Sequence, residues 1–93
     1  MKKLYINTDD YQNGDFALGE TLTAEDWKEK ALYWCDSDGA EELYDYFKNF
    51  DINTKEKEEK LIQDISEIWQ INIVPYDKNN KEHNALRKES EEN

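Results

Sequence analysis

Apolar residues recur along the chain at two different spacings, and the change of spacing predicts the order of its elements. Residues 3–6 (Lys-Leu-Tyr-Ile) are aromatic and β-branched, which favours a short strand. Residues 16–22 alternate in polarity and predict a return strand, joined to the first by a hairpin turn at Asn13-Gly14, because both positions tolerate positive φ. A third strand is predicted at residues 71–74, where the following Pro75 is compatible with an edge position.

The stretch between the second and third strands has the spacing of three helices. Thr23 is expected to cap the first helix, which runs to residues 33–36 and is interrupted by the turn Asp36-Ser37-Asp38-Gly39. A second helix is predicted over residues 40–50, and a third from Asn53 or Thr54 to Trp69. Each helix has one apolar stripe: Trp27, Ala31 and Trp34, then Ala40, Leu43, Phe47 and Phe50, then Leu61, Ile62, Ile65, Ile68 and Trp69.

These elements predict an α+β fold of the order ββαααβ. The expected architecture is a small three-stranded, mostly antiparallel sheet with the helices packed on one face. Residues 1–76 form a single acidic domain in this interpretation. From Asp77 onward apolar residues nearly vanish, so residues 77–93 are predicted to be a disordered or frayed C-terminal tail, with a nascent helix at residues 84–90.

Composition narrows the class of protein. The chain has 93 residues, of which 13% are aromatic, and its formal net charge is −11. Aromatic residues at that level argue against disorder, and the negative charge argues against nucleic acid or an anionic membrane as a direct ligand. The N-terminus lacks the apolar run of a signal peptide, and one cysteine fits a reducing compartment. We therefore expect a soluble protein in the cytoplasm of a bacterial host.

Residues for catalysis are missing from the sequence. His83 is the only histidine and falls in the predicted tail, where we expect it to be solvated. Cys35 is followed by Asp36, whose carboxylate would raise the thiol pKa, so a half-buried structural cysteine is expected. No serine motif and no glycine-rich phosphate loop is present. The sequence predicts a protein that is not an enzyme and needs no cofactor.

The segment Asp36-Ser37-Asp38-Gly39 has some features of a calcium loop. An EF-hand loop needs glycine at its sixth position and a bidentate glutamate at its twelfth. Here glycine is fourth, and Phe47 occupies the twelfth position counted from Asp36. The segment is therefore predicted to be a helix–helix turn ended by Gly39, with no metal site. The sequence does not decide whether Asp36 and Asp38 bind a cation.

The negative charge is concentrated in the first half of the chain. Residues 9–51 contain thirteen acidic residues and three lysines, which is −10 of the total −11. One interpretation is a solvated acidic surface that aids solubility. The other is mimicry of DNA phosphates on a face that binds a basic protein. The partner-binding residues predicted by this second interpretation are Asp9, Asp10, Glu25, Asp26, Glu29, Asp36, Asp38, Glu41, Glu42 and Asp45.

A resemblance to a known family supports the second interpretation. Leu4-Tyr5-Ile6 is followed by Tyr11-Gln12-Asn13-Gly14 and then by Gly19. Residues 4–19 thus resemble the N-terminal hairpin of ArdA-type antirestriction proteins, which are elongated acidic DNA mimics that inhibit Type I restriction enzymes. The present chain is much shorter. The resemblance implies a shared hairpin at Tyr5, Tyr11, Gly14 and Gly19, and a mimic from a mobile element.

The leading hypothesis is an acidic DNA-mimic inhibitor from a phage or mobile element. Its partner would be a basic nucleic-acid-binding protein, such as a restriction or CRISPR nuclease of the host. The alternative is a non-enzymatic interaction module, such as an antitoxin or phage adaptor, that uses the apolar face of residues 61–69 and possible homodimerisation. A small hydrolase or metal protein ranks last. The leading hypothesis requires the acidic residues to gather into one continuous patch.

Overall fold

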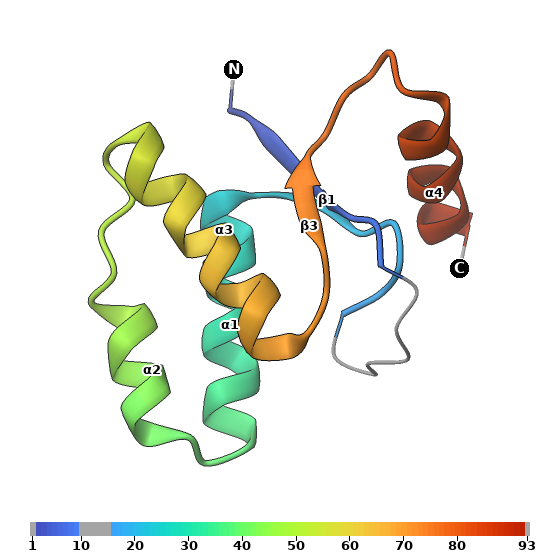
Figure 1. The fold of residues 1–93 in the computed structure, drawn as a ribbon. Coiled ribbons are helices and arrows are strands. Elements are labelled where there is room, and N and C mark those ends of the chain that lie inside the picture. The colour runs from blue at the N-terminus through green and yellow to red at the C-terminus, as the bar shows by residue number, and fades with distance from the viewer. Residues whose placement is uncertain (1, 10–15, 93) are drawn as a thin grey trace.

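The computed structural model describes residues 2–9 and 16–92 and has the predicted α+β architecture. A three-stranded sheet of order β2-β1-β3, antiparallel at both pairings, packs with four helices (Figure 1). The elements are β1 (Leu4–Asn7), β2 (Thr21–Thr23), α1 (Ala24–Ser37), α2 (Glu41–Lys48), α3 (Lys55–Trp69), β3 (Ile73–Pro75) and α4 (Lys81–Glu92). No helix in these described ranges is long and apolar enough to cross a membrane.

The second strand is shorter than the predicted span of residues 16–22. Gly19 has φ +83°, and the Glu20 N–H donates to the Ala17 carbonyl, so a turn replaces the first part of the strand. Phe16 then packs in the core instead of lying in the sheet. The predicted turn at residues 13–14 lies outside the described residues. The remaining part of the predicted strand, β2, pairs with β1 with Tyr5 opposite Leu22, and just before it the Asn7 N–H donates to the Glu20 carbonyl and the Gly19 N–H donates to the Asn7 carbonyl.

The helix ends follow the predicted signals. The Thr23 hydroxyl accepts from the Asp26 N–H at 3.3 Å, and the Thr54 hydroxyl accepts from the Lys57 N–H at 3.2 Å, so both predicted caps are confirmed. Gly39, at φ +71°, follows the end of α1 and forms the turn to α2. The helix α2 is shorter at both ends than the predicted 40–50.

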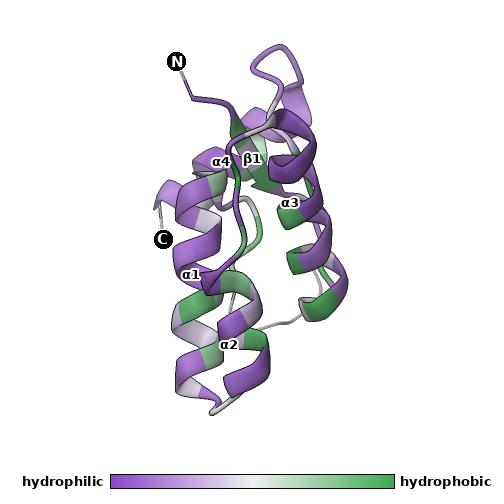
Figure 2. Ribbon diagram, turned by 90° about the vertical axis from the view of Figure 1, so that its left-hand side faces the viewer, coloured by the Kyte–Doolittle hydropathy of each residue, from purple (hydrophilic) through white to green (hydrophobic). Residues whose placement is uncertain are grey.

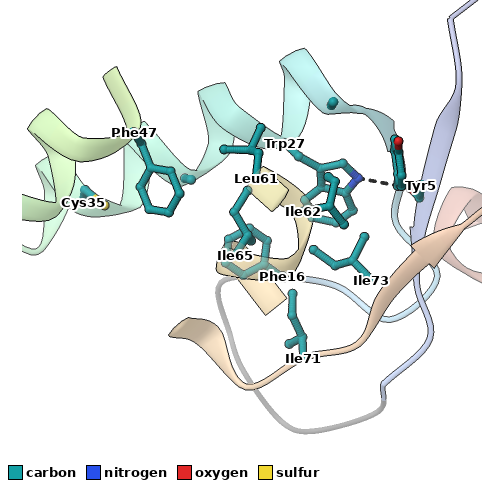
Figure 3. Packing of buried hydrophobic residues seen from close by; sticks show 12 residues of the cluster. Tyr5, Phe16, Trp27, Cys35, Phe47, Leu61, Ile62, Ile65, Ile71 and Ile73 are labelled. Carbon is teal, nitrogen blue, oxygen red and sulfur yellow. Dashed lines mark hydrogen bonds between the residues drawn. The ribbon is translucent and has the colours of Figure 1, made fainter. Parts of the chain in front are cut away.

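One core joins the sheet to the first three helices. Trp27 of α1 is fully buried and its indole Nε1 donates to the Tyr5 carbonyl of β1 at 3.1 Å (Figure 3). The Phe16 ring lies 5.8 Å from the Trp27 ring and 5.1 Å from the Trp69 ring. Phe47 of α2 is also fully buried in this cluster. Hydrophobic residues of the helices accordingly gather on the sides that face one another (Figure 2).

Residues 81–92 form the helix α4, where the sequence predicts a disordered or frayed tail with only a nascent helix at residues 84–90. The Asn80 side-chain oxygen accepts from the N–H groups of Glu82 and His83, and this N-cap was not among the predicted ones. His83 is not solvated as expected: its ring stacks on Tyr76 with centroids 6.2 Å apart. Arg87 lies 5.1 Å from the centre of the Tyr76 ring. These contacts stabilise a helix that apolar periodicity alone does not predict.

The helix α4 lies on the side of the sheet away from α1 and α3 (Figure 1). The backbone at Gly19 passes against the backbone of α4 so closely that a Cβ on Gly19 would overlap the Leu86 carbonyl. Alternation along β1 places Ile6 on this second face of the sheet, outside the main cluster, and Ile6 is fully buried. The helices therefore occupy both sides of the sheet, with α1 and α3 on the predicted one.

The strand β3 is an edge strand, a position with which Pro75 is compatible. It begins two residues later than the predicted 71–74 and includes Pro75, which was predicted to follow it. Its pairing with β1 uses bonds from Thr8 to Asn72 and from Tyr76 to Leu4, so the N–H of Ile73 points away from β1. That N–H donates to the Ser66 hydroxyl of α3 at 3.2 Å, and Pro75 has no N–H. Of the two outward-facing backbone donors of β3, the N–H of Ile73 is thus bonded within the molecule, and the one at Pro75 does not exist.

Candidate functional site

The turn between α1 and α2 brings acidic residues from two helices together. Asp36 of α1 and Glu41 and Asp45 of α2 line one surface pocket of about 350 Å³, with Cys35 and Tyr44 also in its wall. All three carboxylate residues are exposed. Two helices that run antiparallel through a short turn must place the end of one beside the start of the other, so this cluster follows from the helix order.

The outer side of α1 extends this cluster. Glu25, Glu29 and Asp36 are spaced by four and seven residues, so they share one side of the helix over roughly 16 Å at 1.5 Å per residue. We call the exposed carboxylates of the two helices and their turn the acidic face: Glu25, Asp26, Glu29, Asp36, Asp38, Glu41, Glu42 and Asp45.

Lysines of the same helices do not neutralise this face. Lys28 donates to the Phe50 carbonyl at 2.7 Å, and Lys30 pairs with Glu20 on another side of α1. Within residues 2–9 and 16–92, the only ion pair of the acidic face joins Glu25 to Lys2 at 2.7 Å. The carboxylates around the turn therefore retain their charge.

Eight of the ten predicted partner-binding residues belong to the acidic face. Of the other two, Asp9 is described by the structure and does not belong to it. Asp9 comes two residues after β1, and β1 lies away from the turn that joins α1 to α2 (Figure 1). It is half-buried, and its backbone N–H donates to the Asn7 side chain at 3.1 Å. Asp10 lies outside the described residues. The predicted patch therefore does not extend to Asp9, and its continuity over the other eight residues stays a prediction.

Part of this negative charge has a structural use. Glu25 and Asp26 lie in the first turn of α1, and Glu41 and Glu42 in the first turn of α2, where the helix dipole favours anions by about 0.3–1 kcal/mol each. The dipole matters most for α2, because its N-cap Ala40 provides no side-chain hydrogen bond. Solubility and helix stability thus account for the acids at the helix starts.

The same argument does not account for the acids at the end of α1. Asp36 lies in the last turn and Asp38 is the C-cap, where the dipole disfavours a carboxylate, and no basic residue occupies that turn. Both side chains are exposed and neither has an ion-pair partner in the described part of the chain. Among residues 2–9 and 16–92, no ion pair offsets the unfavourable interaction of these two carboxylates with the helix dipole.

Cys35 beneath the turn is a buried structural residue. Its side chain is 2% exposed and its thiol is free. Burial is the larger cause that raises its pKa, and the charge of Asp38 is the second. The predicted direction is confirmed, although the carboxylate responsible is Asp38 and not the adjacent Asp36. In the ranges described, no three metal-binding side chains converge, at this turn or elsewhere.

Among the described residues, Tyr33 is the most exposed large hydrophobic one, with 65% of its surface accessible. It lies on α1 four residues after Glu29 and three before Asp36, so it is a helical neighbour of both. Its ring meets the Trp34 ring edge to face at 5.1 Å. A large aromatic ring that neighbouring contacts hold in place is the type of residue that anchors protein interfaces.

The apolar stripe of α3 is used inside the molecule. Leu61, Ile62 and Ile65 are buried in the core against α1 and the sheet. Only Ile68 is open to solvent, at 42%. The apolar face on which the alternative hypothesis depends is therefore already occupied by the protein's own side chains.

Comparison with known proteins returned no match to a family model, a curated protein or a solved structure. The resemblance of residues 4–19 to ArdA-type proteins stays a prediction, and two of its four positions, Tyr11 and Gly14, lie outside the described residues.

Proposed function

We propose that this protein is a non-enzymatic, acidic DNA-mimic inhibitor from a phage or mobile element. It binds a basic nucleic-acid-processing defence enzyme of the host, a restriction or CRISPR nuclease, and acts in the bacterial cytoplasm. The observation that carries the proposal is the placement of Asp36 and Asp38, exposed and without a paired cation in the described residues, at the end of α1 where they cost stability. Function is a common reason for retaining such residues.

The geometry of the acidic face suits a groove that normally holds DNA. Carboxylates three or four residues apart on a helix have Cβ atoms about 5–6 Å from one another. B-DNA carries one charge per roughly 1.7 Å of axis over two strands, so a short helical hairpin can present a comparable density. Such a face attracts a basic groove by long-range steering, and Tyr33 supplies an apolar anchor at its centre.

The test is capture of the partner from host extract on the immobilised protein, followed by binding measurements with the purified partner. The test variant carries Glu41→Lys, Glu42→Lys and Asp45→Lys. A matched variant carries Glu56→Lys, Glu67→Lys and Glu89→Lys, which makes the same charge change at exposed positions outside the acidic face. We expect the first variant to lose at least about 100-fold in affinity and the second to lose less than about tenfold.

Folding must be separated from binding in this test. Glu41 and Glu42 lie in the first turn of α2, so their reversal to lysine destabilises that helix. A third variant with Glu41→Gln, Glu42→Gln and Asp45→Asn removes charge without adding lysine, and circular dichroism verifies its helix content. Affinity that does not fall with rising salt, or that falls equally in the test and matched variants, would contradict the proposal.

A further inference from the structure

A second hollow lies at the opposite end of the molecule from the α1–α2 turn. It has a volume of about 390 Å³, and its lining residues come from the start of the chain and β1, from the start of α1 and from the segment where α3 begins. We call it the N-terminal pocket. Its charged and phenolic residues are Lys2, Lys3, Tyr5, Glu25, Lys55 and Glu58.

The charge of this pocket is opposite to that of the chain. Three lysines and two glutamates line it, a local excess of one positive charge in a protein of net charge −11. The three lysines come from two segments that are about fifty residues apart in the sequence. Folding therefore gathers cations here, although acidic residues outnumber basic ones by 23 to 12.

Both carboxylates of the pocket already have partners. Glu25 accepts a hydrogen bond from Lys2 at 2.7 Å, and Glu58 accepts one from the Tyr5 hydroxyl at 3.1 Å. Tyr5 is 1% exposed, so its hydroxyl holds Glu58 at the floor of the pocket. In the described ranges, neither Lys3 nor Lys55 makes an ion pair, and Lys3 lies 5.5 Å from the centre of the Tyr5 ring. The uncompensated groups of the pocket, among the residues described, are thus two ammonium ions.

The start of α1 also borders the pocket. The first N–H groups of a helix have no intrahelical partner, and here the Thr23 hydroxyl accepts from the N–H of Asp26. The N–H groups of Ala24 and Glu25 belong to that first turn, and both residues line the pocket. Ammonium ions and first-turn N–H groups are both groups that bind oxyanions.

We propose that the N-terminal pocket binds the phosphate group of a compact small molecule, with Lys3 and Lys55 as its main contacts and Lys2 at the rim. Lysine acts as a point charge toward phosphate, and a dianion matches two free ammonium ions better than a single carboxylate does. The volume lies at the lower end of the range for small-molecule sites. The pocket shares Glu25 with the acidic face, and phosphate binding can be measured without the proposed partner.

The test is a titration of the full chain with inorganic phosphate and with pyrophosphate, replacing sodium chloride at constant ionic strength. Amide chemical shifts and melting temperature are both measured. The pocket variant carries Lys3→Gln and Lys55→Gln, and the matched variant carries Lys78→Gln and Lys88→Gln, two exposed lysines outside the pocket. Both variants change the net charge equally, so long-range electrostatics affect them alike.

We expect shift changes confined to residues 2–5, 23–25 and 52–58, and a rise in melting temperature of about 3 °C or more at saturation. The dissociation constant should rise at least about tenfold in the pocket variant and less than about threefold in the matched one. Tighter binding of pyrophosphate than of phosphate would indicate a polyphosphate ligand, and the reverse a monophosphate. Shift changes spread over all lysines, equal losses in the two variants, or no response beyond that of chloride would overturn the proposal.

Discussion

Substitution of Gly19 and Gly39, the two described glycines with positive φ, separates backbone strain from the packing of α4. Gly39 has φ +71° and a Cβ there would meet no atom within 4 Å, whereas a Cβ on Gly19, at φ +83°, overlaps the Leu86 carbonyl. Gly39→Ala should therefore cost only the strain of a left-handed alanine, about 1 kcal/mol. Gly19→Ala adds the displacement of α4, and we expect a total loss of about 2–3 kcal/mol.

Urea unfolding followed by tryptophan fluorescence measures the two losses, and hydrogen exchange of residues 81–92 measures the docking of α4. A loss of about 1 kcal/mol corresponds to about 4–8 °C in melting temperature for a domain of this size. We expect faster exchange in α4 for Gly19→Ala only. Equal losses in the two variants, with unchanged protection of α4, would refute the close approach of Gly19 and Leu86 as the contact that holds α4 in place.

Three further predictions concern the core and its borders. Burial and the hydrogen bond to Glu58 raise the pKa of Tyr5 from 10.0 to about 12. The stabilising contribution of the Tyr5 hydroxyl is therefore complete below pH 10 and is lost as the pH rises to 12. The unfolding free energies of wild type and Tyr5→Phe, measured across that window, should converge. Trp27→Phe removes a buried hydrogen bond and part of a ring, and should cost about 2–4 kcal/mol in denaturant unfolding. Ile68→Glu should change the free energy of unfolding by less than about 0.5 kcal/mol and leave the mass measured by sedimentation unchanged, because Ile68 is exposed. A larger change in the unfolding free energy or in the mass would assign Ile68 to an interface.

The strongly periodic segments were predictable from sequence. The stripes of α1 and α3 repeat every three or four residues, and Thr23 and Thr54 lie where a side-chain oxygen can accept from the first turn. The edge position of β3 agrees with Pro75, because proline cannot donate to an inner ladder. These features depend on neighbours a few residues away, which the sequence displays directly.

The features that could not be predicted depend on contacts between distant residues. The helix α4 has little apolar periodicity, and its start is fixed by Asn80 and its packing by Tyr76 and the backbone at Gly19. The short β2 results from burial of Phe16 beside Trp69, a residue more than fifty positions later. The acidic residues of α1 and α2 could be predicted, but their separation from Asp9 depends on how the sheet and the helices are arranged in space.

The occupied outer edge of β3 has a consequence for assembly. An exposed strand edge is a template on which another chain can add a strand, and proteins that remain monomeric must block it. Here one hydroxyl and one proline remove both outward donors over the length of β3. Extended peptides and further copies of this sheet therefore find no row of amides to join on that side, which protects the protein from edge-to-edge aggregation.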